Sequence, residues 1–121
     1  MNVIPLLKQL SDIAGVTGCE EPVSQLLQQM WAPLTDEVRQ DKMGSLIALK
    51  GGSGSGPRPK LMLAAHMDEI GLRVTGIEKG FLRVTSVGGS DRRVLLGVDV
   101  LVHASRGGRD LPGVIATLIF S

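Results

Sequence analysis

The feature that most constrains this 121-residue chain is an apolar run that ends abruptly in ionisable side chains: Leu61-Met62-Leu63-Ala64-Ala65-His66-Met67-Asp68-Glu69-Ile70-Gly71. A continuous apolar run is typical of a strand that is covered on both faces. Side chains alternate along a strand, so we expect His66 and Asp68 on one side and Met67 and Glu69 on the other. Open α/β sheets bind ligands at the carboxyl ends of their strands. A buried strand over residues 60–66 would therefore bring an imidazole and a carboxylate to a catalytic or metal site.

The His66-x-Asp68 spacing suits metal binding but does not require it. A histidine can bind zinc or cobalt through one ring nitrogen while an acceptor fixes the other nitrogen. Asp68 could be that acceptor, or it could approach the metal itself. A hydrogen-bonded histidine at the end of a strand, with no metal role, fits the same spacing. Both interpretations stay open on spacing alone.

Other catalytic arrangements find less support. A glycosidase pair of Asp68 and Glu69 fails on geometry, because adjacent strand residues point to opposite faces. Cys19 has no catalytic motif around it, and no Gly-x-Ser-x-Gly sequence occurs. His103 is expected to be a packing or surface residue. The sequence at 91–93 (Asp-Arg-Arg) indicates a solvated loop, and the Gly/Ser/Pro-rich stretch 51–59 indicates a flexible connection rather than a phosphate-binding loop.

Composition excludes several partner classes. Thirteen basic and twelve acidic residues leave a formal charge of +1, and two Phe, one Trp and no Tyr supply no stacking platform, so we expect no nucleic-acid partner. Cys19 is the single cysteine, which excludes an intramolecular disulfide and suits a reducing compartment. The N-terminus lacks a signal-peptide pattern, and the apolar runs are too short to span a bilayer. A cytoplasmic protein with no membrane partner is the expectation.

The periodicity predicts helices first and strands later. Helices are expected over residues 2–14 and from Pro22 to Trp31, where Pro33 ends the second one. Strands are expected around Val38 and over 45–49 and 60–66, and then over 70–75, 81–85, 94–96, 98–103 and 113–119. Turns are expected at 41–44, 78–80 and 107–110. This change of character near residue 69 predicts a domain boundary.

Several ordered motifs resemble the M42 family of metalloaminopeptidases, which includes glutamyl, deblocking and tetrahedral aminopeptidases. The resemblance is carried by the stretch 65–71 (Ala-His-Met-Asp-Glu-Ile-Gly), by 87–89 (Val-Gly-Gly), 94–97 (Val-Leu-Leu-Gly) and 112–115 (Pro-Gly-Val-Ile), and upstream by 18–21 (Gly-Cys-Glu-Glu) and 41–48. It runs through nearly all of the chain in the right order. Ser45 stands where the family more often has asparagine.

The resemblance implies a fold class, a cofactor and roles for two residues. The fold would be α/β: residues 1–68 as the N-terminal part of a mixed-sheet catalytic domain, and residues 69–121 as an incomplete β-rich, barrel-like inserted dimerisation domain. His66 would bind one metal of a site that holds two divalent ions, zinc or cobalt. Asp68 would be the catalytic carboxylate that orients this histidine. Peptides would be the substrates, and the family's homo-oligomers are dimers that assemble into dodecamers.

The chain also departs from the family pattern. Family members are more than twice as long, and their remaining metal ligands and glutamate general base would lie outside these 121 residues. The chain alone is therefore expected to be inactive. Two alternatives stay open: a related M20- or M28-type dinuclear metallopeptidase or deacylase, and a non-catalytic module that self-associates through unpaired strand edges.

Overall fold

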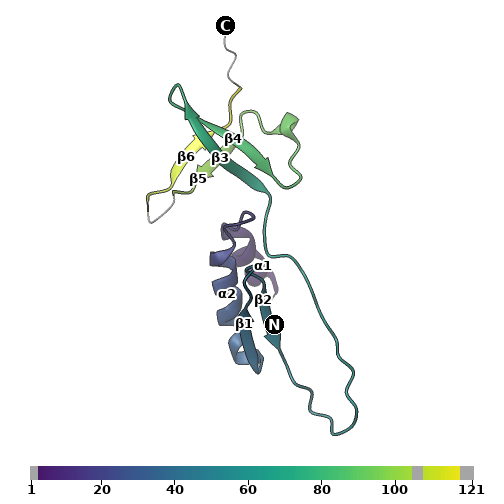
Figure 1. Ribbon diagram of the computed structural model, residues 1–121. Coiled ribbons are helices and arrows are strands. Elements are labelled where there is room, and N and C mark those ends of the chain that lie inside the picture. The colour runs from purple at the N-terminus through teal and green to yellow at the C-terminus, as the bar shows by residue number, and fades with distance from the viewer. Residues whose placement is uncertain (1–2, 105–107, 118–121) are drawn as a thin grey trace. The chain divides into compact units, whose positions relative to one another are not determined.

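The structure is a computed structural model that describes residues 3–104 and 108–117. Contacts within the chain group it into two compact units, residues 1–88 and 89–121, which are described separately. The first unit contains α1 (Val3–Asp12), α2 (Glu21–Trp31), the 3-10 turn η1 (Ala32–Leu34), β1 (Glu37–Gln40), β2 (Leu46–Leu49), β3 (Gly71–Glu78) and β4 (Phe81–Val87). The second contains the 3-10 turn η2 (Arg92–Val94), β5 (Asp99–Val102) and β6 (Leu111–Val114) (Figure 1). The predicted mixture of helices and strands is confirmed, whereas a barrel-like inserted domain stays a prediction.

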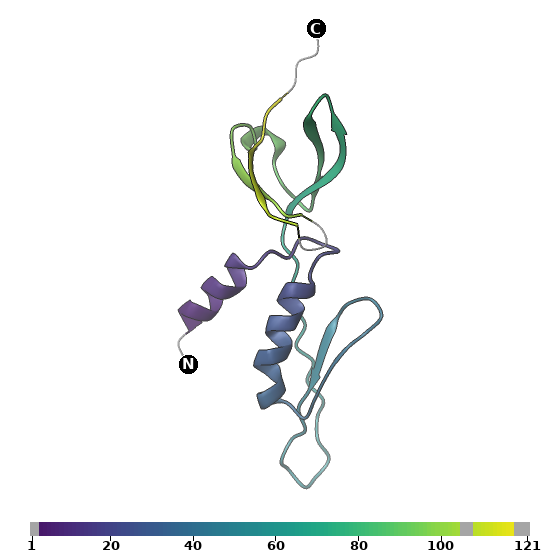
Figure 2. The same ribbon diagram turned by 90° about the vertical axis from the view of Figure 1, so that its left-hand side faces the viewer.

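Helix α2 lies beside the β1–β2 hairpin, as Figures 1 and 2 show. Pro22 occupies the first turn of the helix, where its missing N–H costs nothing, and Glu21 lies near the positive end of the helix dipole. Val23 and Ser24 are the buried side chains of α2, with exposed fractions of 5% and 3%. Helix α1 begins within the predicted range but ends at Asp12, two residues earlier than expected.

The β1–β2 hairpin pairs antiparallel from Glu37↔Leu49 to Gln40↔Leu46. Its turn is fixed by Asp41, whose Oδ1 accepts hydrogen bonds from the backbone N–H groups of Met43 and Ser45 over 2.8 and 2.9 Å. Gly44 has a φ of +92°, which a side chain would strain. The predicted turn at 41–44 is confirmed.

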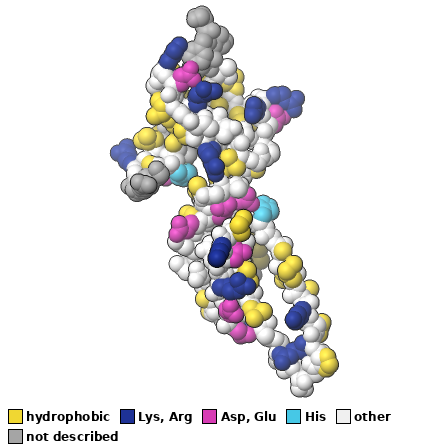
Figure 3. All heavy atoms as spheres, in the orientation of Figure 1, with side chains coloured by type: hydrophobic (Ala, Val, Ile, Leu, Met, Phe, Trp, Pro, Cys, Tyr) yellow, Lys and Arg dark blue, Asp and Glu magenta, His cyan; other side chains and the backbone are white. Residues whose placement is uncertain are grey.

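The predicted buried strand at 60–66 is wrong. Residues 50–68 form no helix or strand, and Figure 1 shows them as a long extended loop between β2 and β3. Leu61, Met62 and Leu63 are 86%, 85% and 88% exposed, and Figure 3 shows apolar side chains on the surface of this loop. A strand needs a paired neighbour for its backbone groups, and within the described residues no strand pairs with this run. The composition of this run is that of a buried strand, but the described residues leave its leucine and methionine side chains exposed.

The β3–β4 hairpin confirms the predicted strands at 70–75 and 81–85. Its register runs from Gly71↔Val87 to Glu78↔Phe81, with a shift between Val74 and Gly76. Lys79 and Gly80 turn the chain with φ values of +49° and +85°, the conformation of a tight two-residue hairpin turn.

In the second unit, the strand predicted at 94–96 is wrong. Asp91 Oδ1 accepts a hydrogen bond from the Arg93 N–H over 3.0 Å, and Val94 N donates to Asp91 O over 3.2 Å. This capping of η2 draws the chain into a 3-10 turn instead of a strand. The exposed ion pair of Asp91 with Arg93 agrees with the predicted solvated loop.

Strands β5 and β6 pair antiparallel from Asp99↔Val114 to Val102↔Leu111. The strand predicted at 98–103 is confirmed, whereas the one predicted at 113–119 begins earlier, at Leu111, and ends at Val114. Ile115 continues the contact without forming a strand, because its N–H donates to Val98 O over 3.0 Å. Residues 118–119 and residue 107 of the predicted turn lie outside the described residues.

Candidate metal-ligand pair

The candidate site is the contact between His66 and Asp68. His66 Nδ1 lies 3.0 Å from Asp68 Oδ1 and 2.9 Å from the backbone oxygen of the same residue. The two side chains therefore meet as the His-x-Asp spacing predicts, although the backbone there is not part of a named strand. The imidazole is 84% exposed and the carboxylate 35% exposed.

The neighbours of the imidazole determine which ring nitrogen carries the proton. A backbone carbonyl can only accept a hydrogen bond, and so can an ionised carboxylate, so Nδ1 carries the proton and donates. In the neutral ring Nε2 then has a free lone pair. A metal-binding histidine has this arrangement, with the second ring nitrogen donating to a carboxylate or a carbonyl.

Asp68 is held from its other side by the loop between α1 and α2. Thr17 Oγ1 donates to Asp68 Oδ2 over 2.6 Å, from a position 51 residues earlier in the chain. This hydrogen bond is the largest cause that holds the pKa of the Asp68 carboxyl below its usual value; partial burial opposes it, and the hydrogen bond from His66 adds to it. Asp68 is therefore ionised at neutral pH, as the proton assignment of His66 requires.

The same loop fastens the neighbouring backbone. Glu69 N donates to Gly15 O over 2.9 Å, while Gly15 N donates to Glu69 Oε1 over 3.0 Å. Val16 and Glu69 form a parallel bridge. From β3, Arg73 Nη2 donates to Thr17 O over 2.7 Å. The sequence did not predict these contacts, because the residue types at 15–18 do not indicate which distant segment lies beside them.

Close backbone approach explains two glycines at this junction. A Cβ on Gly15 would lie 2.5 Å from Val23 Cγ2, and a Cβ on Gly71 would lie 2.5 Å from Val16 Cγ2. Separations below 3.0 Å would force a shift of the neighbour, so these positions need glycine for space. The glycines let the α1–α2 loop, α2 and the His66–Asp68 segment pack against one another.

The described residues do not form a complete metal site. Across residues 3–104 and 108–117, no group of three or more His, Cys, Asp or Glu side chains is arranged to hold a metal ion. The other histidine, His103, is exposed, and its Nδ1 lies 3.0 Å from Asp110 Oδ2. His103 thus lies at the surface, one of the two positions expected from the sequence. Cys19 is an exposed thiol in the α1–α2 loop.

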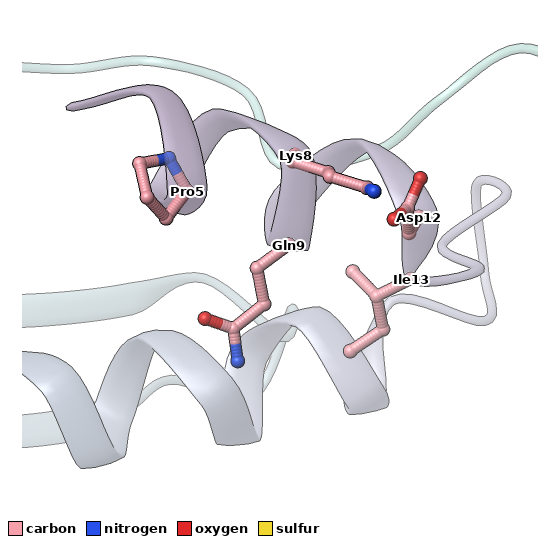
Figure 4. A pocket seen from close by; sticks show the side chains of 5 residues that line it. All are labelled: Pro5, Lys8, Gln9, Asp12 and Ile13. Atoms are coloured by element: carbon pink, nitrogen blue, oxygen red, sulfur yellow. The ribbon is translucent and has the colours of Figure 1, made fainter. Parts of the chain in front are cut away.

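An open groove lies elsewhere in the first unit, on α1. Pro5, Lys8, Gln9, Asp12 and Ile13 line it, and Figure 4 shows Gln9 and Ile13 projecting toward a neighbouring helix. None of these residues belongs to the His66–Asp68 contact.

None of the helices in the described part of the chain combines the length and the apolar character needed to cross a membrane.

Comparison with known proteins places the chain in a family. The family model of the M42 glutamyl aminopeptidases matches residues 44–119, more than half of the chain, and the chain belongs to this family. The lysyl aminopeptidase of Pyrococcus furiosus is 38% identical over 106 residues, which are 86% of this chain and 30% of that protein.

Two solved structures resemble the chain closely. The TET aminopeptidase of a marine-sediment Thaumarchaeota archaeon has a TM-score of 0.82 and 34% identity, over 94% of this chain and 31% of that one. The aminopeptidase APDkam598 of Desulfurococcus kamchatkensis has a TM-score of 0.82 and 41% identity, over 96% of this chain and 32% of that one. The chain thus spans less than a third of the length of these relatives.

Proposed function

We propose that His66 is a metal ligand in a metal-dependent aminopeptidase and that Asp68 orients it. The observation that carries this proposal is the double contact of His66 Nδ1 with the Asp68 carboxylate and carbonyl. It fixes the proton on Nδ1 and leaves Nε2, on a largely exposed ring, to face a cation. Membership of the M42 family supports the same role.

The proposed cofactor is a pair of divalent ions, zinc or cobalt. When bound, such ions polarise a peptide carbonyl and lower the pKa of a water molecule that attacks it. Of the ligands of such a site, this chain would supply His66. The further ligands and the general base are proposed to come from the part of the protein that corresponds to the remaining two thirds of its relatives.

Asp68 has a defined task in this proposal. Its ionised carboxylate holds the Nδ1 proton of His66 and thereby fixes the tautomer and the plane of the ring. A negative charge beside the ring also makes Nε2 a better electron donor. Asp68 is a positioning residue in this role, because it acts through His66.

The domain organisation and partners are proposals of the same kind. Residues 1–68 would belong to the catalytic domain and residues 69–121 to an inserted β-rich dimerisation domain. In support, the described elements from β3 onward are strands, apart from the three-residue η2. Peptides would be the substrates, further copies of the protein its partners in dimers and a dodecamer, and the cytoplasm its compartment.

A chimera tests the proposed function. This chain would replace the matching N-terminal third of the Desulfurococcus kamchatkensis aminopeptidase, and release of amino acids from aminoacyl p-nitroanilides would be measured with zinc or cobalt. We expect activity that His66→Gln abolishes and that the matched change His103→Gln leaves intact. Full activity of the His66→Gln chimera would contradict the proposal. The 121-residue chain alone is expected to release no amino acid, so metal-dependent release by it would contradict that statement.

A further inference from the structure

Thr17 has a contact that the proposed function does not use. Its hydroxyl donates to one oxygen of the Asp68 carboxylate over 2.6 Å, while the other oxygen accepts from His66 Nδ1 over 3.0 Å. We propose that Thr17 is a positioning residue that acts through Asp68 to set the orientation and the tautomer of His66. The importance of this for metal binding rests on the proposed function, but the effect on the ring does not.

The Asp68 carboxylate needs a hydrogen bond that fixes its orientation. The last torsion of an aspartate side chain is broad, so an unrestrained carboxylate rotates readily. In the described residues, the hydrogen bonds of the Asp68 side chain go to Thr17 and His66. His66 is itself 84% exposed and therefore little restrained by packing. Thr17 is the partner that is anchored elsewhere in the fold, so its hydroxyl determines where the carboxylate points.

Thr17 is anchored by contacts on both sides of the loop. Arg73 Nη2 from β3 donates to the Thr17 carbonyl over 2.7 Å. Two residues earlier, Gly15 exchanges hydrogen bonds with the backbone and the side chain of Glu69. Within the loop, Cys19 N donates to Val16 O over 2.7 Å. The Thr17 hydroxyl thus belongs to a loop that is hydrogen-bonded to Glu69 and to Arg73, which both follow Asp68 in the chain.

A purely structural role for this hydrogen bond predicts something different. If the bond only fastens the α1–α2 loop, its loss should lower stability and leave the His66 ring as it was. If Thr17 positions His66 through Asp68, its loss should change the proton distribution of the ring in a chain that is still folded. The two roles are therefore separated by a measurement on the ring.

Nitrogen-15 NMR of the imidazole supplies that measurement. The chain has two histidines, so His103→Gln leaves His66 as the only source of imidazole signals in the full 121-residue chain. The test variants in this background are Thr17→Val, which keeps the shape and removes the hydroxyl, and Thr17→Ala, which adds no methyl group beside the carboxylate. Thr17→Ser keeps the hydroxyl and is the matched control.

With the His66 ring in its neutral form, we expect the parent chain and Thr17→Ser to show a protonated Nδ1 and an unprotonated Nε2. Thr17→Val and Thr17→Ala should shift both signals part of the way toward the average of two tautomers, since the Asp68 carbonyl still accepts from Nδ1, while their amide spectra remain those of a folded chain. The parent pattern in either folded variant would overturn the proposal, and so would a failure of Thr17→Ser to keep it.

Zinc chloride then tests whether this positioning of the ring matters for binding a cation. Added zinc should perturb the Nε2 signal of the parent chain, and Thr17→Val should weaken that response by about tenfold, at the lower end of effects on a ligand's hydrogen-bond partner. A tautomer that depends on Thr17, together with a zinc-loaded chimera that stays fully active when His66 is changed to Gln, would contradict the proposed function and support the positioning role. Equal zinc responses in parent and Thr17→Val would count against the positioning role.

Discussion

Gly15 and Glu69 lie 54 residues apart and join through both polar groups of the glycine backbone. Glu69 N donates to Gly15 O, and Glu69 Oε1 accepts from Gly15 N. Here a single glutamate serves the amide and the carbonyl together, and it fastens the α1–α2 loop next to His66 and Asp68.

Removing the Glu69 side chain should loosen this junction. Glu69→Ala deprives the part-buried Gly15 N–H of its acceptor, which should lower the free energy of unfolding by about 1–2 kcal/mol. Glu69→Gln keeps a side-chain oxygen that can accept, so a smaller loss is expected. Urea unfolding at neutral pH measures both. Equal stability of the parent chain and Glu69→Ala would show that water replaces the contact without cost.

Gly15 should not tolerate a side chain. In Gly15→Ala the new Cβ would lie 2.5 Å from Val23 Cγ2, and Val23 is a buried side chain of α2. Overpacking of this kind should cost about 1–3 kcal/mol in the free energy of unfolding. Gly54→Ala is the matched control, since a Cβ there meets nothing within 4 Å. If the clash is the cause, the loss from Gly15→Ala should shrink in a Val23→Ala background.

The apolar run in the extended loop should accept polar residues. Leu63 is 88% exposed, so Leu63→Ser should change the free energy of unfolding of the 121-residue chain by less than about 0.5 kcal/mol. Val23→Ser is the contrast, because it places a hydroxyl at a position that is 5% exposed and should cost more than about 1 kcal/mol. A large loss from Leu63→Ser in urea unfolding would indicate that this run is covered in solution.

The Asp91–Arg93 contact should make its region sensitive to acid. Hydrogen bonds from the Arg93 guanidinium and N–H hold the pKa of Asp91 below its usual 3.8. A pKa that is lower in the folded chain means that the contact stabilises the fold above pH 3.8 and that this contribution is lost as the pH falls through the folded value. Carbon-13 NMR of the Asp91 carboxyl should give a midpoint below 3.8, and Arg93→Gln should raise it. An unchanged midpoint in Arg93→Gln would contradict the assigned cause.

Local signals predicted the elements whose stabilising contacts are close in the sequence. Pro22 and the apolar spacing that follows it predict α2, and the turn residues Lys79-Gly80 predict the β3–β4 hairpin. The side-by-side arrangement of His66 and Asp68 followed from the alternation of extended backbone. The metal role of His66 and the boundary at residue 69 stay predictions.

Features that depend on distant residues could not be predicted. The run at 61–65 has the composition of a buried strand, yet composition does not say whether a covering layer is present in the same chain. The strand expected at 94–96 does not form, because the Asp91 side chain caps the 3-10 turn η2 there. Thr17 bonds Asp68 across 51 residues and Arg73 bonds Thr17 across 56, and a single sequence read by itself carries no record of such pairs.

The long-range ties of the α1–α2 loop also bear on the order in which the chain folds. Both helices and the β1–β2 hairpin rest on contacts between near neighbours, which form quickly. The bonds from Gly15 and Thr17 to residues 68–73 each close a loop of more than fifty residues, so they form only after a larger loss of chain entropy. During synthesis, the helices would leave the ribosome well before residues 66–73 exist. His66 should therefore reach its final orientation late, once β3 has arrived to complete the junction.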